Sequence, residues 1–373
     1  MNDTFNFIQG MVDMTIFPAR ALGASLVFWS LLLGHVCHAQ TAPSVAKEPQ
    51  ALAALPSEPG NDLLKRFGFM PSECPGFTQV AANYQSRFSA PMRAWADQHT
   101  AKLNAKKVVY PFSGADIVTV ASVFPAANHL ILVADQWPEY ASNKPVAAGQ
   151  AAKECETMMY FARYGYFRTN DLEGKNSIKP RFIKLLTYNV ALSDAKIRSI
   201  DYLTLGEGGV AAVHTKLDGI QPDGLRFLVN TASGRELKID YVRMDLSNNG
   251  LSIGKKYHAF MLAQMDDAVM IKSASHLLQK PYFSTLASVV ADKTKSVVQD
   301  ETGLDIEPLR KVFDVKSYGK FHAPHPLWRD SASGQRLIKY LSEQSGIESL
   351  PFTIGYEKKS GSVLLVGARK VTP

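Results

Sequence analysis

Four short polar clusters in the sequence each follow an apolar segment with the composition of a β-strand. The clusters are Ser113-Gly114-Ala115-Asp116, Asp135, Ser275-His276 and Asp300-Glu301. The segments that precede them are residues 107–112, 129–134, 268–273 and 296–299. Ligands of open parallel sheets bind beyond the carboxyl ends of the strands. If the four segments belong to one such sheet, the clusters meet at one edge, which is the candidate site.

Two hypotheses for this edge stay open. In the first, the protein is not a catalyst and binds an unknown small molecule or a component of the cell envelope. The ligand-binding residues would then be Ser113, Gly114, Asp116, Asp135 and Ser275.

The second hypothesis is a hydrolase or a group-transfer enzyme. His276 would be the general acid or base, since a histidine side chain titrates near neutral pH. Asp300 or Asp135 would orient its ring, and Ser113 would contact the substrate. Loops after strands are polar in any case because they face water. The pattern alone therefore does not decide between a binding protein and an enzyme.

The turn at Ser113-Gly114 can be compared with the dinucleotide-binding motif G-x-G-x-x-G. Only Gly114 of its three glycines is present, although an acidic residue, Asp135, follows at an interval of about 20 residues, as in the motif. The segment resembles a Rossmann-type or methyltransferase-like fold whose cofactor loop is not intact. We therefore expect no bound cofactor.

Other site classes lack their motifs. The sequence contains no G-x-S-x-G elbow and no H-E-x-x-H pair. His322 and His325 have a metal-like spacing, but Pro324 and Pro326 keep them off a helix, and two histidines make a poor site. We expect no metal. The formal net charge of +7 is spread along the chain, and no nucleic-acid-binding signature accompanies it, so we expect no nucleic-acid partner.

The elements that would carry these residues predict an α/β fold. A content of 46% hydrophobic and 10% aromatic residues excludes a disordered chain. Residues 107–134 have the pattern strand, turn, helix and strand, at the length of a βαβ unit. Both strands are apolar throughout, which is typical of parallel strands covered on both faces. We therefore expect a Rossmann-like, mostly parallel sheet.

Two regions depart from this parallel plan. Residues of about 198–263 alternate like antiparallel hairpins, with a turn signal at Asn248-Asn249-Gly250, and predict an inserted antiparallel β region. Residues 352–356 and 362–369 predict a C-terminal β-hairpin.

The first 39 residues predict a cleavable signal peptide. Arg20 precedes the apolar run Ala21–Leu33, and Cys37 and Ala39 supply small residues before a cut after Ala39. The Pro-rich residues 40–60 predict a flexible linker, and residues 61–373 a single α/β domain. No later run of 18 apolar residues predicts a transmembrane segment in the mature chain. We expect a periplasmic or secreted protein.

Cleavage would leave two cysteines, Cys74 and Cys155. Disulfides persist in oxidising compartments outside the cytoplasm, and the two cysteines have neither redox nor metal spacing. We therefore expect a structural disulfide between them, the alternative being two separate buried thiols.

Several blocks resemble a family of exported, uncharacterised bacterial proteins. The first is Tyr110-Pro-Phe-Ser-Gly-Ala-Asp116, followed by Phe124-Pro125 and the strand that ends at Asp135. Further blocks are Ser273–Ser284, Gln299–Gly303, Tyr318-Gly319, Gly355-Tyr356 and Gly367-Ala-Arg369. The resemblance covers residue 107 to the end, and the family pattern has Pro where this chain has Ala115. It implies a shared fold and export, and no particular activity or catalytic residue.

We predict that the mature protein begins at Gln40, because residues 1–39 match a cleavable signal and are too short in their apolar part to stay in a membrane. N-terminal sequencing of material released from an exporting host checks this. Recovery of the protein from the cytoplasm with Met1 or Met14 intact would contradict it.

Overall fold

The computed structural model describes residues 74–134, 150–164, 182–215, 222–320, 329–355 and 361–371. The predicted signal peptide and the predicted linker at residues 40–60 lie outside these residues. Over the described part of the chain, no helix combines the length and the apolarity that crossing a membrane requires.

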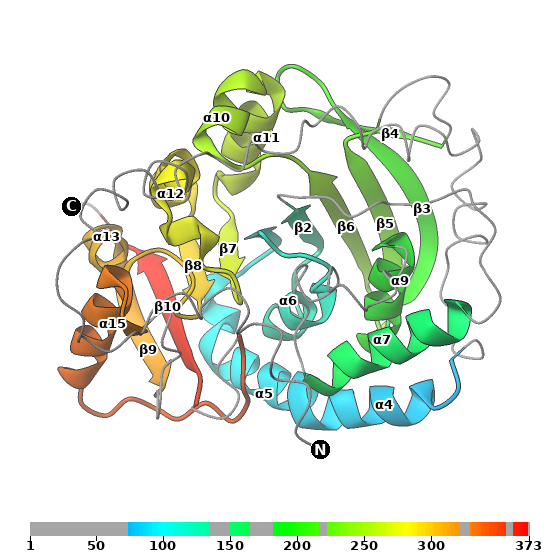
Figure 1. Ribbon diagram of the computed structural model, residues 1–373, viewed down its shortest axis with the longest axis horizontal. Helices are drawn as coiled ribbons and strands as arrows, with labels where there is room; N and C mark the ends of the chain where they lie inside the picture. Colours follow the sequence, from blue (N-terminus) through cyan, green and yellow to red (C-terminus); the bar gives the residue numbers. More distant parts are fainter. Residues whose placement is uncertain are drawn as a thin grey trace, which may run out of the picture. The chain divides into compact units, whose positions relative to one another are not determined.

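One mixed sheet organises the described residues (Figure 1). Its ten strands have the order β4-β3-β5-β6-β2-β1-β7-β8-β10-β9. Their bounds are β1 Lys107–Pro111, β2 His129–Ala134, β3 Lys196–Leu205, β4 Ala211–His214, β5 Gly224–Asn230, β6 Glu236–Arg243, β7 Val269–Lys272, β8 Ser296–Gln299, β9 Phe313–Gly319 and β10 Val363–Arg369. The five central strands, from β6 to β8, pair in parallel. The protein is therefore an α/β protein with antiparallel strands at both sides of a parallel centre.

The expected neighbourhood of four parallel strands is confirmed. β1 pairs in parallel with β2 on one side, where Val108 lies opposite Leu130, and with β7 on the other, where it lies opposite Val269. β7 in turn pairs in parallel with β8. Because the chain leaves β1 for β2 on one side and later returns to its other side as β7, the boundary between β1 and β7 is the switch point of the sheet.

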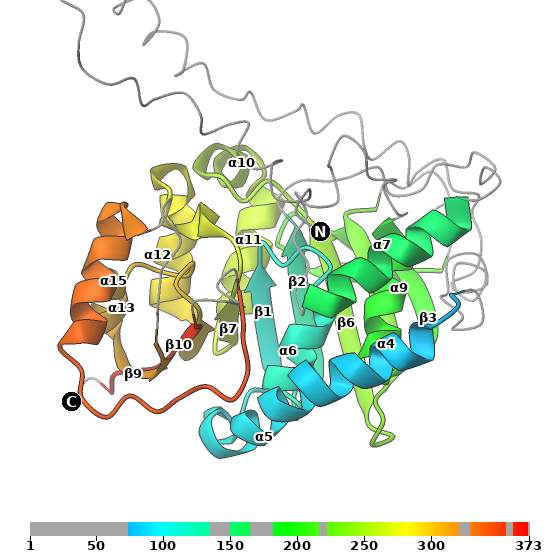
Figure 2. The same cartoon turned by 60° about the horizontal axis from the view of Figure 1, so that its bottom comes forward.

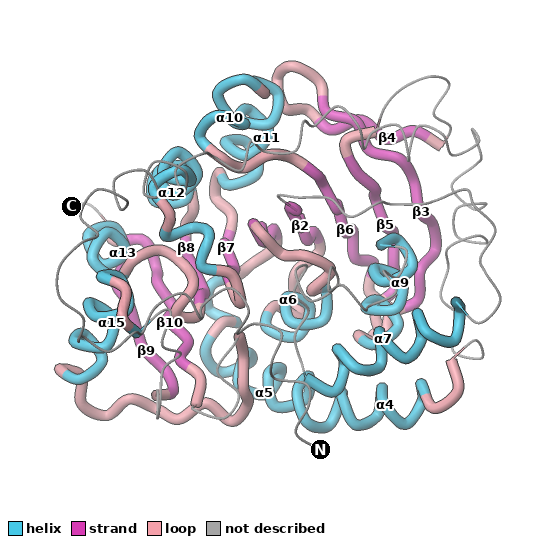
Figure 3. Tube along the Cα trace, viewed as in Figure 1, coloured by secondary structure: helices cyan, strands magenta, loops and turns pink. Residues whose placement is uncertain are grey.

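Helices cover both faces of this sheet (Figures 2 and 3). The first face carries α4 Phe77–Tyr84, α5 Ala90–His99, α6 Ile117–Val123, α7 Gln150–Tyr164 and α9 Phe182–Leu192. The second face carries α10 Asn248–Ile253, α11 Lys255–Met265, α12 Ser284–Lys293, α13 Ile306–Val312 and α15 Ala332–Ser342. Short turns of other helix types, among them η3 Gln85–Ser89, η5 His276–Gln279 and η6 Pro281–Phe283, join some of them.

The two faces have separate hydrophobic cores. Along β1, Val108 and Tyr110 pack into the core of the first face, whereas Val109 packs into that of the second. Along β2, Leu130 and Leu132 face the first core. Burial on both sides explains why these strands are apolar at every position and do not alternate.

The predicted antiparallel region is found in part, because β3 pairs antiparallel with β4 and β5, and β5 pairs antiparallel with β6. The prediction is wrong in two respects. β6 lies within this region, yet β6 pairs in parallel with β2 and belongs to the central strands. Residues 248–265 form α10 and α11 in place of hairpins. The physical reason lies at Ser247, whose Oγ accepts a hydrogen bond from the Gly250 N–H and caps α10. Residues with turn propensity thus begin a helix here.

The predicted C-terminal hairpin is only partly found. β10 is a strand, but it pairs antiparallel with β8 and β9, and residues 352–355 form no strand. Phe352 and Ile354 are instead buried against the core of the first face. Ser362 Oγ accepts a hydrogen bond from the Ile354 N–H and donates one to its carbonyl. A side chain therefore makes the contacts that the predicted ladder would have made, while residues 356–360 lie outside the described residues.

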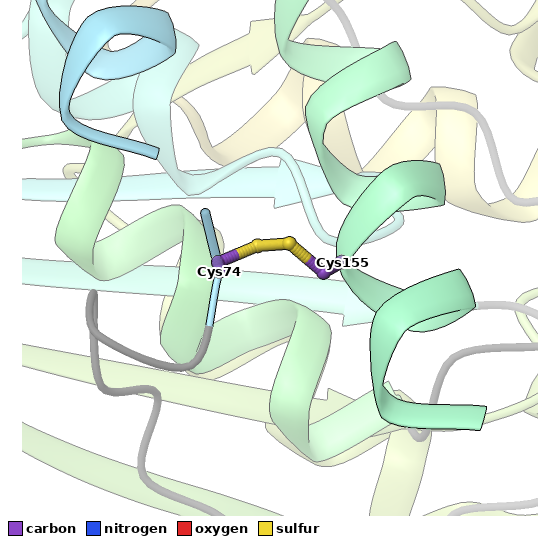
Figure 4. The surroundings of a disulfide bond; sticks show 2 residues. All are labelled: Cys74 and Cys155. Carbon is purple, nitrogen blue, oxygen red and sulfur yellow. A yellow bond between two sulfur atoms is a disulfide. The ribbon is translucent and has the colours of Figure 1, made fainter. Parts of the chain in front are cut away.

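The predicted disulfide is present. Cys74 and Cys155 are bonded, with their Cα atoms 5.5 Å apart (Figure 4). The bond ties the residue before the first turn of α4 to α7, and both cysteines are buried. It closes a loop with a sequence separation of 81 residues, so it holds together the first layer of helices.

We predict that reducing this disulfide lowers the free energy of unfolding by about 4 kcal/mol, because a cross-link of this separation restricts the unfolded chain. Urea denaturation of the oxidised protein, the reduced protein and a Cys74→Ser/Cys155→Ser variant measures it. The reduced protein and the variant should agree with each other. Equal stability of all three would show that the bond does not constrain the unfolded chain.

Candidate functional site

The loops that follow β1, β7 and β8 meet at the carboxyl edge of the parallel strands, beside the switch point. The loop after β1 leads into α6, which Asp116 caps by accepting a hydrogen bond from the Thr119 N–H at 3.2 Å. Asp116 is 2% exposed, so this carboxyl group is inside the protein. The hydroxyl of Tyr110, on β1, donates to Asp116 Oδ2 at 3.2 Å.

A buried lysine lies next to this carboxyl group. Lys272 is the last residue of β7 and is 0% exposed. Its Nζ donates a hydrogen bond of 2.9 Å to the carbonyl of Ser273. The charges of Asp300, Glu301 and Asp116, which come from two other loops, act on this ammonium group. One cation therefore sits among three carboxyl groups, all withdrawn from water.

This charged cluster holds the loop after β7, residues 273–276. The Ser273 carbonyl accepts a hydrogen bond from Lys272 and, at 3.4 Å, a bifurcated one from the Tyr110 hydroxyl, which shares its single proton between this carbonyl and Asp116 Oδ2. The Ala274 N–H donates to Asp300 Oδ2 at 2.7 Å. The Ser275 N–H donates to Thr302 Oγ1 at 3.2 Å. Four hydrogen bonds from β1, β7 and the loop after β8 thus fix the backbone of a four-residue segment.

Backbone strain accompanies this anchoring. Ala274 has φ 55° and Phe112, at the end of β1, has φ 56°. Residues with a Cβ rarely adopt such values, which cost about 1–2 kcal/mol each. Such strain persists where the surroundings over-determine the backbone, and it clusters at functional sites. Both outliers lie at the carboxyl ends of the two strands that flank the switch point.

The ionisable groups of the cluster have shifted pKa values. Burial lowers the pKa of Lys272 to about 8, against the opposing charges of Asp300, Glu301 and Asp116. Burial raises the pKa of Asp116 to about 6, although hydrogen bonds from Thr119 and Tyr110 favour its charged form. Both shifts bring a titration closer to neutral pH, as is common at functional sites.

His276 lies half-buried at the start of η5, at the same edge. Burial lowers the pKa of His276 to about 4, with the charge of Asp300 acting in the opposite direction. A lowered pKa favours the neutral imidazole, which is the form that a general base requires, so the role of His276 as general acid or base stays a prediction.

The segment before β10 packs against the same edge. A Cβ added to Gly355, which has φ +73°, would lie 2.4 Å from Asp300 Oδ2. Only glycine lets the backbone approach this carboxylate so closely. The remaining oxygen of Asp300, Oδ1, accepts hydrogen bonds from the N–H of Thr302 at 2.8 Å and from its hydroxyl at 2.5 Å. Asp300 thus holds three segments together at the edge.

The structure brings some of the predicted site residues together and not others. Asp116, Asp300 and His276 all belong to one electrostatic neighbourhood around Lys272. Ser275 is half-buried in the loop that this neighbourhood holds. The remaining predicted positions take no visible part in it: Ser113 and Gly114 are buried, the Ser113 hydroxyl donates to the Gly114 carbonyl, and Asp135 lies outside the described residues.

Three contributors were missed by the sequence reasoning, namely Lys272, Tyr110 and Thr302. The sequence held a signal for Lys272, because this lysine ends a strand that is otherwise apolar and so is placed to be buried with it. A buried lysine almost always has charged or polar partners, and these partners would have pointed to the cluster. Tyr110 and Thr302 offer no such signal, since a tyrosine in a strand and a threonine in a turn are ordinary in any α/β protein.

Within the described ranges, no group of three or more His, Cys, Asp and Glu side chains is arranged to hold a metal ion. His322 and His325 lie outside these ranges. The carboxyl groups of the cluster are engaged by Lys272 and by backbone N–H groups, so its chemistry is that of an internal ion network.

We predict that Asp116→Asn removes a pH dependence of stability. The Asp116 pKa is about 6 in the folded protein against 3.8 ordinarily, so the folded state binds this proton more tightly. The free energy of unfolding of the wild type therefore falls by about 2 kcal/mol between pH 4 and pH 7 through this group. Asparagine keeps the helix cap but has no proton to lose.

Urea denaturation from pH 4 to pH 7 gives the free energy of unfolding of the variant and of the wild type. The effect is the change with pH in the difference between these two free energies, and a difference that is the same at every pH does not affect it. Asp97→Asn, at an exposed carboxyl group on α5, is the matched control and should follow the wild type. Parallel curves for Asp116→Asn and the wild type would show that Asp116 titrates normally.

No family model matches the chain, and no curated protein matches it. The function is therefore argued from the geometry of this edge alone.

Proposed function

We propose that the protein is exported and binds a small polar ligand at the carboxyl edge of its parallel strands, over the switch point between β1 and β7. In our proposal the fold is Rossmann-like, and its strand arrangement is of the methyltransferase-like type. Seven strands, β6-β2-β1-β7-β8-β10-β9, would form its core, with β10 antiparallel and β3, β4 and β5 added at one side.

One observation carries the proposal: the segment 273–276 is strained and at the same time fixed from three sides. Four hydrogen bonds hold it, two of them to the Ser273 carbonyl. The groups that make these bonds are buried, whereas Ser275 and His276 are half-buried and so partly accessible to solvent. A rigid loop supported by a second layer of buried polar groups is how binding sites keep their geometry.

The chemistry of this loop fits a polar ligand without a strong charge requirement. The side chains that it presents are a hydroxyl, from Ser275, and an imidazole, from His276, that is uncharged at neutral pH. Both can donate and accept hydrogen bonds. The charged groups of the cluster interact with one another inside the protein. They therefore position the loop and do not contact the ligand.

A hydrolase or group-transfer enzyme is the second candidate. Its support is that the charge of Asp300 acts on His276, as the dyad would require. Asp300 already accepts hydrogen bonds from the Ala274 N–H and from two donors of Thr302. Its structural role in holding the loop is therefore the stronger one, and binding is the function that we favour.

Export rests on three supports. Residues 1–39 have the pattern of a cleavable signal, and the chain resembles a family of exported proteins. The Cys74–Cys155 bond requires an oxidising compartment to persist, which the periplasm or the exterior supplies.

We predict that the loop after β7 contacts the ligand. Protein purified under native conditions from an exporting host should carry a small molecule that native mass spectrometry detects as an added mass. Ser275→Ala combined with His276→Ala should lose this mass, because the ligand's hydrogen-bond partners are removed while the buried network stays. His214→Ala, on the edge strand β4, removes an imidazole at the far side of the sheet and should retain it.

For a ligand lost on purification, a library of small polar compounds is screened by NMR. Perturbed amides at residues 113–116, 273–276 and 300–303 support the proposal. Absence of any retained mass together with no perturbation at these residues, or perturbations confined to another face, would refute it. Turnover of a bound compound that His276→Ala abolishes would establish the enzyme in place of the binding protein.

A further inference from the structure

A concave site lies between α4 and α7 and is lined by none of the residues of the loops at the strand ends. The two helices lie side by side, as Figures 1 and 2 both show. Between them is a groove with a volume of about 300 Å³. Its floor is apolar and consists of Val80, Tyr84 and Phe88 from the first helix layer and Met159 and Ala162 from α7. This volume is at the lower end of the range of ligand pockets, about 300–1,000 Å³.

The local sequence explains the shape of the groove. Val80, Tyr84 and Phe88 are spaced four residues apart and so lie on one side of a continuous helical segment. This segment passes from α4 into the π-helical turn η3, which brings the adjacent residues Arg87 and Phe88 to the groove together. Turns of this kind within helices are rare and are frequently found at functional sites.

The rim of the groove is polar and carries a single charge. Gln79 and Asn83 line it and are bonded to each other, with Gln79 Nε2 donating to Asn83 Oδ1 at 3.1 Å. Arg87 is the only charged side chain among the lining residues. In the described part of the chain this guanidinium faces the ring of Phe88, at 5.3 Å from its centroid, and makes no ion pair. Among the residues that the structure describes, a cation without an ion-pair partner therefore stands above an apolar floor.

We infer that this groove binds a small amphiphilic carboxylate, with its apolar body on the floor and its carboxylate on Arg87. The charge complementarity decides the class of ligand, because a guanidinium presents parallel N–H donors that match a carboxylate in a bidentate manner. The apolar floor favours an aliphatic body over a sugar or an amino acid. The small volume favours a short chain. The site is separate from the edge of the sheet and does not depend on the function proposed there.

The disulfide lies next to this groove in the sequence of both its sides. Pro75 and Gly76, directly after Cys74, line the groove, and Met159, which also lines it, lies one helical turn beyond Cys155. The bond, which Figure 4 shows, thus links the residues before α4 covalently to α7. Such a clamp holds the walls at a fixed spacing before the ligand arrives, which lowers the cost of binding. Reduction of the bond should therefore weaken binding without removing any group that touches the ligand.

The test compares octanoate with 1-octanol, which has the same chain and no charge. Isothermal titration calorimetry gives the affinities, and NMR of the methyl groups of Val80 and Ala162 locates the ligand. We expect saturable binding of octanoate with perturbations at both residues. Arg87→Gln should weaken octanoate binding about tenfold or more, since an ion-assisted hydrogen bond is lost. The same variant should bind octanol as the wild type does.

Arg93→Gln is the matched control. Arg93 lies on α5, donates to Gln85 Oε1 at 2.8 Å and does not line the groove, so octanoate affinity should stay unchanged. Met159→Trp fills the groove from its partly exposed wall and should abolish binding of both probes. Circular dichroism of each variant confirms that it folds. Oxidised wild type should bind octanoate more tightly than the reduced protein.

Three results would overturn the inference. The first is no saturable binding of octanoate, or binding that leaves Val80 and Ala162 unperturbed. The second is equal affinity of the wild type and Arg87→Gln for octanoate, which removes the carboxylate from the argument. The third is a concentration-dependent dimer in analytical ultracentrifugation that Met159→Trp dissociates, which makes a second copy of the chain the occupant.

Discussion

The buried ammonium group of Lys272 is the constraint on which the candidate site depends. A charge without water is expensive, and it is tolerated only when opposite charges and hydrogen bonds surround it. Asp116, Asp300 and Glu301 supply the opposite charges, and the Ser273 carbonyl supplies a hydrogen-bond acceptor. These groups belong to the segments that follow three strands: Asp116 follows β1, Ser273 follows β7, and Asp300 and Glu301 follow β8. Satisfying one lysine therefore requires the loops after β1, β7 and β8 to adopt fixed positions relative to one another.

The position of this lysine also explains why the edge is rigid and not merely polar. Removing one partner from a buried ion pair costs about 3–5 kcal/mol, so the arrangement resists change at any single member. The strain at Ala274 and Phe112 persists because this network and the sheet hold the backbone on both sides. Polar groups that face inward provide the geometry, and the half-buried side chains of Ser275 and His276 provide the contact surface in the function that we propose.

Much of the central sheet could be predicted from the sequence, because parallel strands buried on both faces are apolar at every position. That signal identified β1, β2, β7 and β8 and hence the edge at which their loops meet. It could not identify the partners of the remaining strands. β6 forms the expected antiparallel pair with β5, yet its parallel pairing with β2 on its other side is decided by the order in which strands join the sheet, which no local pattern encodes. The ion network was missed for a related reason, since the contacts that tie Tyr110 and Thr302 to the loop after β7 are made over long distances in the sequence.

The place of β10 has a consequence for the order in which this chain can fold. β10 follows β9 in the sequence but lies between β8 and β9, where it pairs with both. β9 has no route into the sheet until residues 363–369 have arrived. Pairings of this kind have a high contact order and form late. A chain delivered across a membrane from its N-terminus would complete β1 to β8 first and hold the β9 region open. The sheet would then be completed only when residue 369 has crossed the membrane. This order favours translocation of the whole chain up to β10 before the native fold is complete.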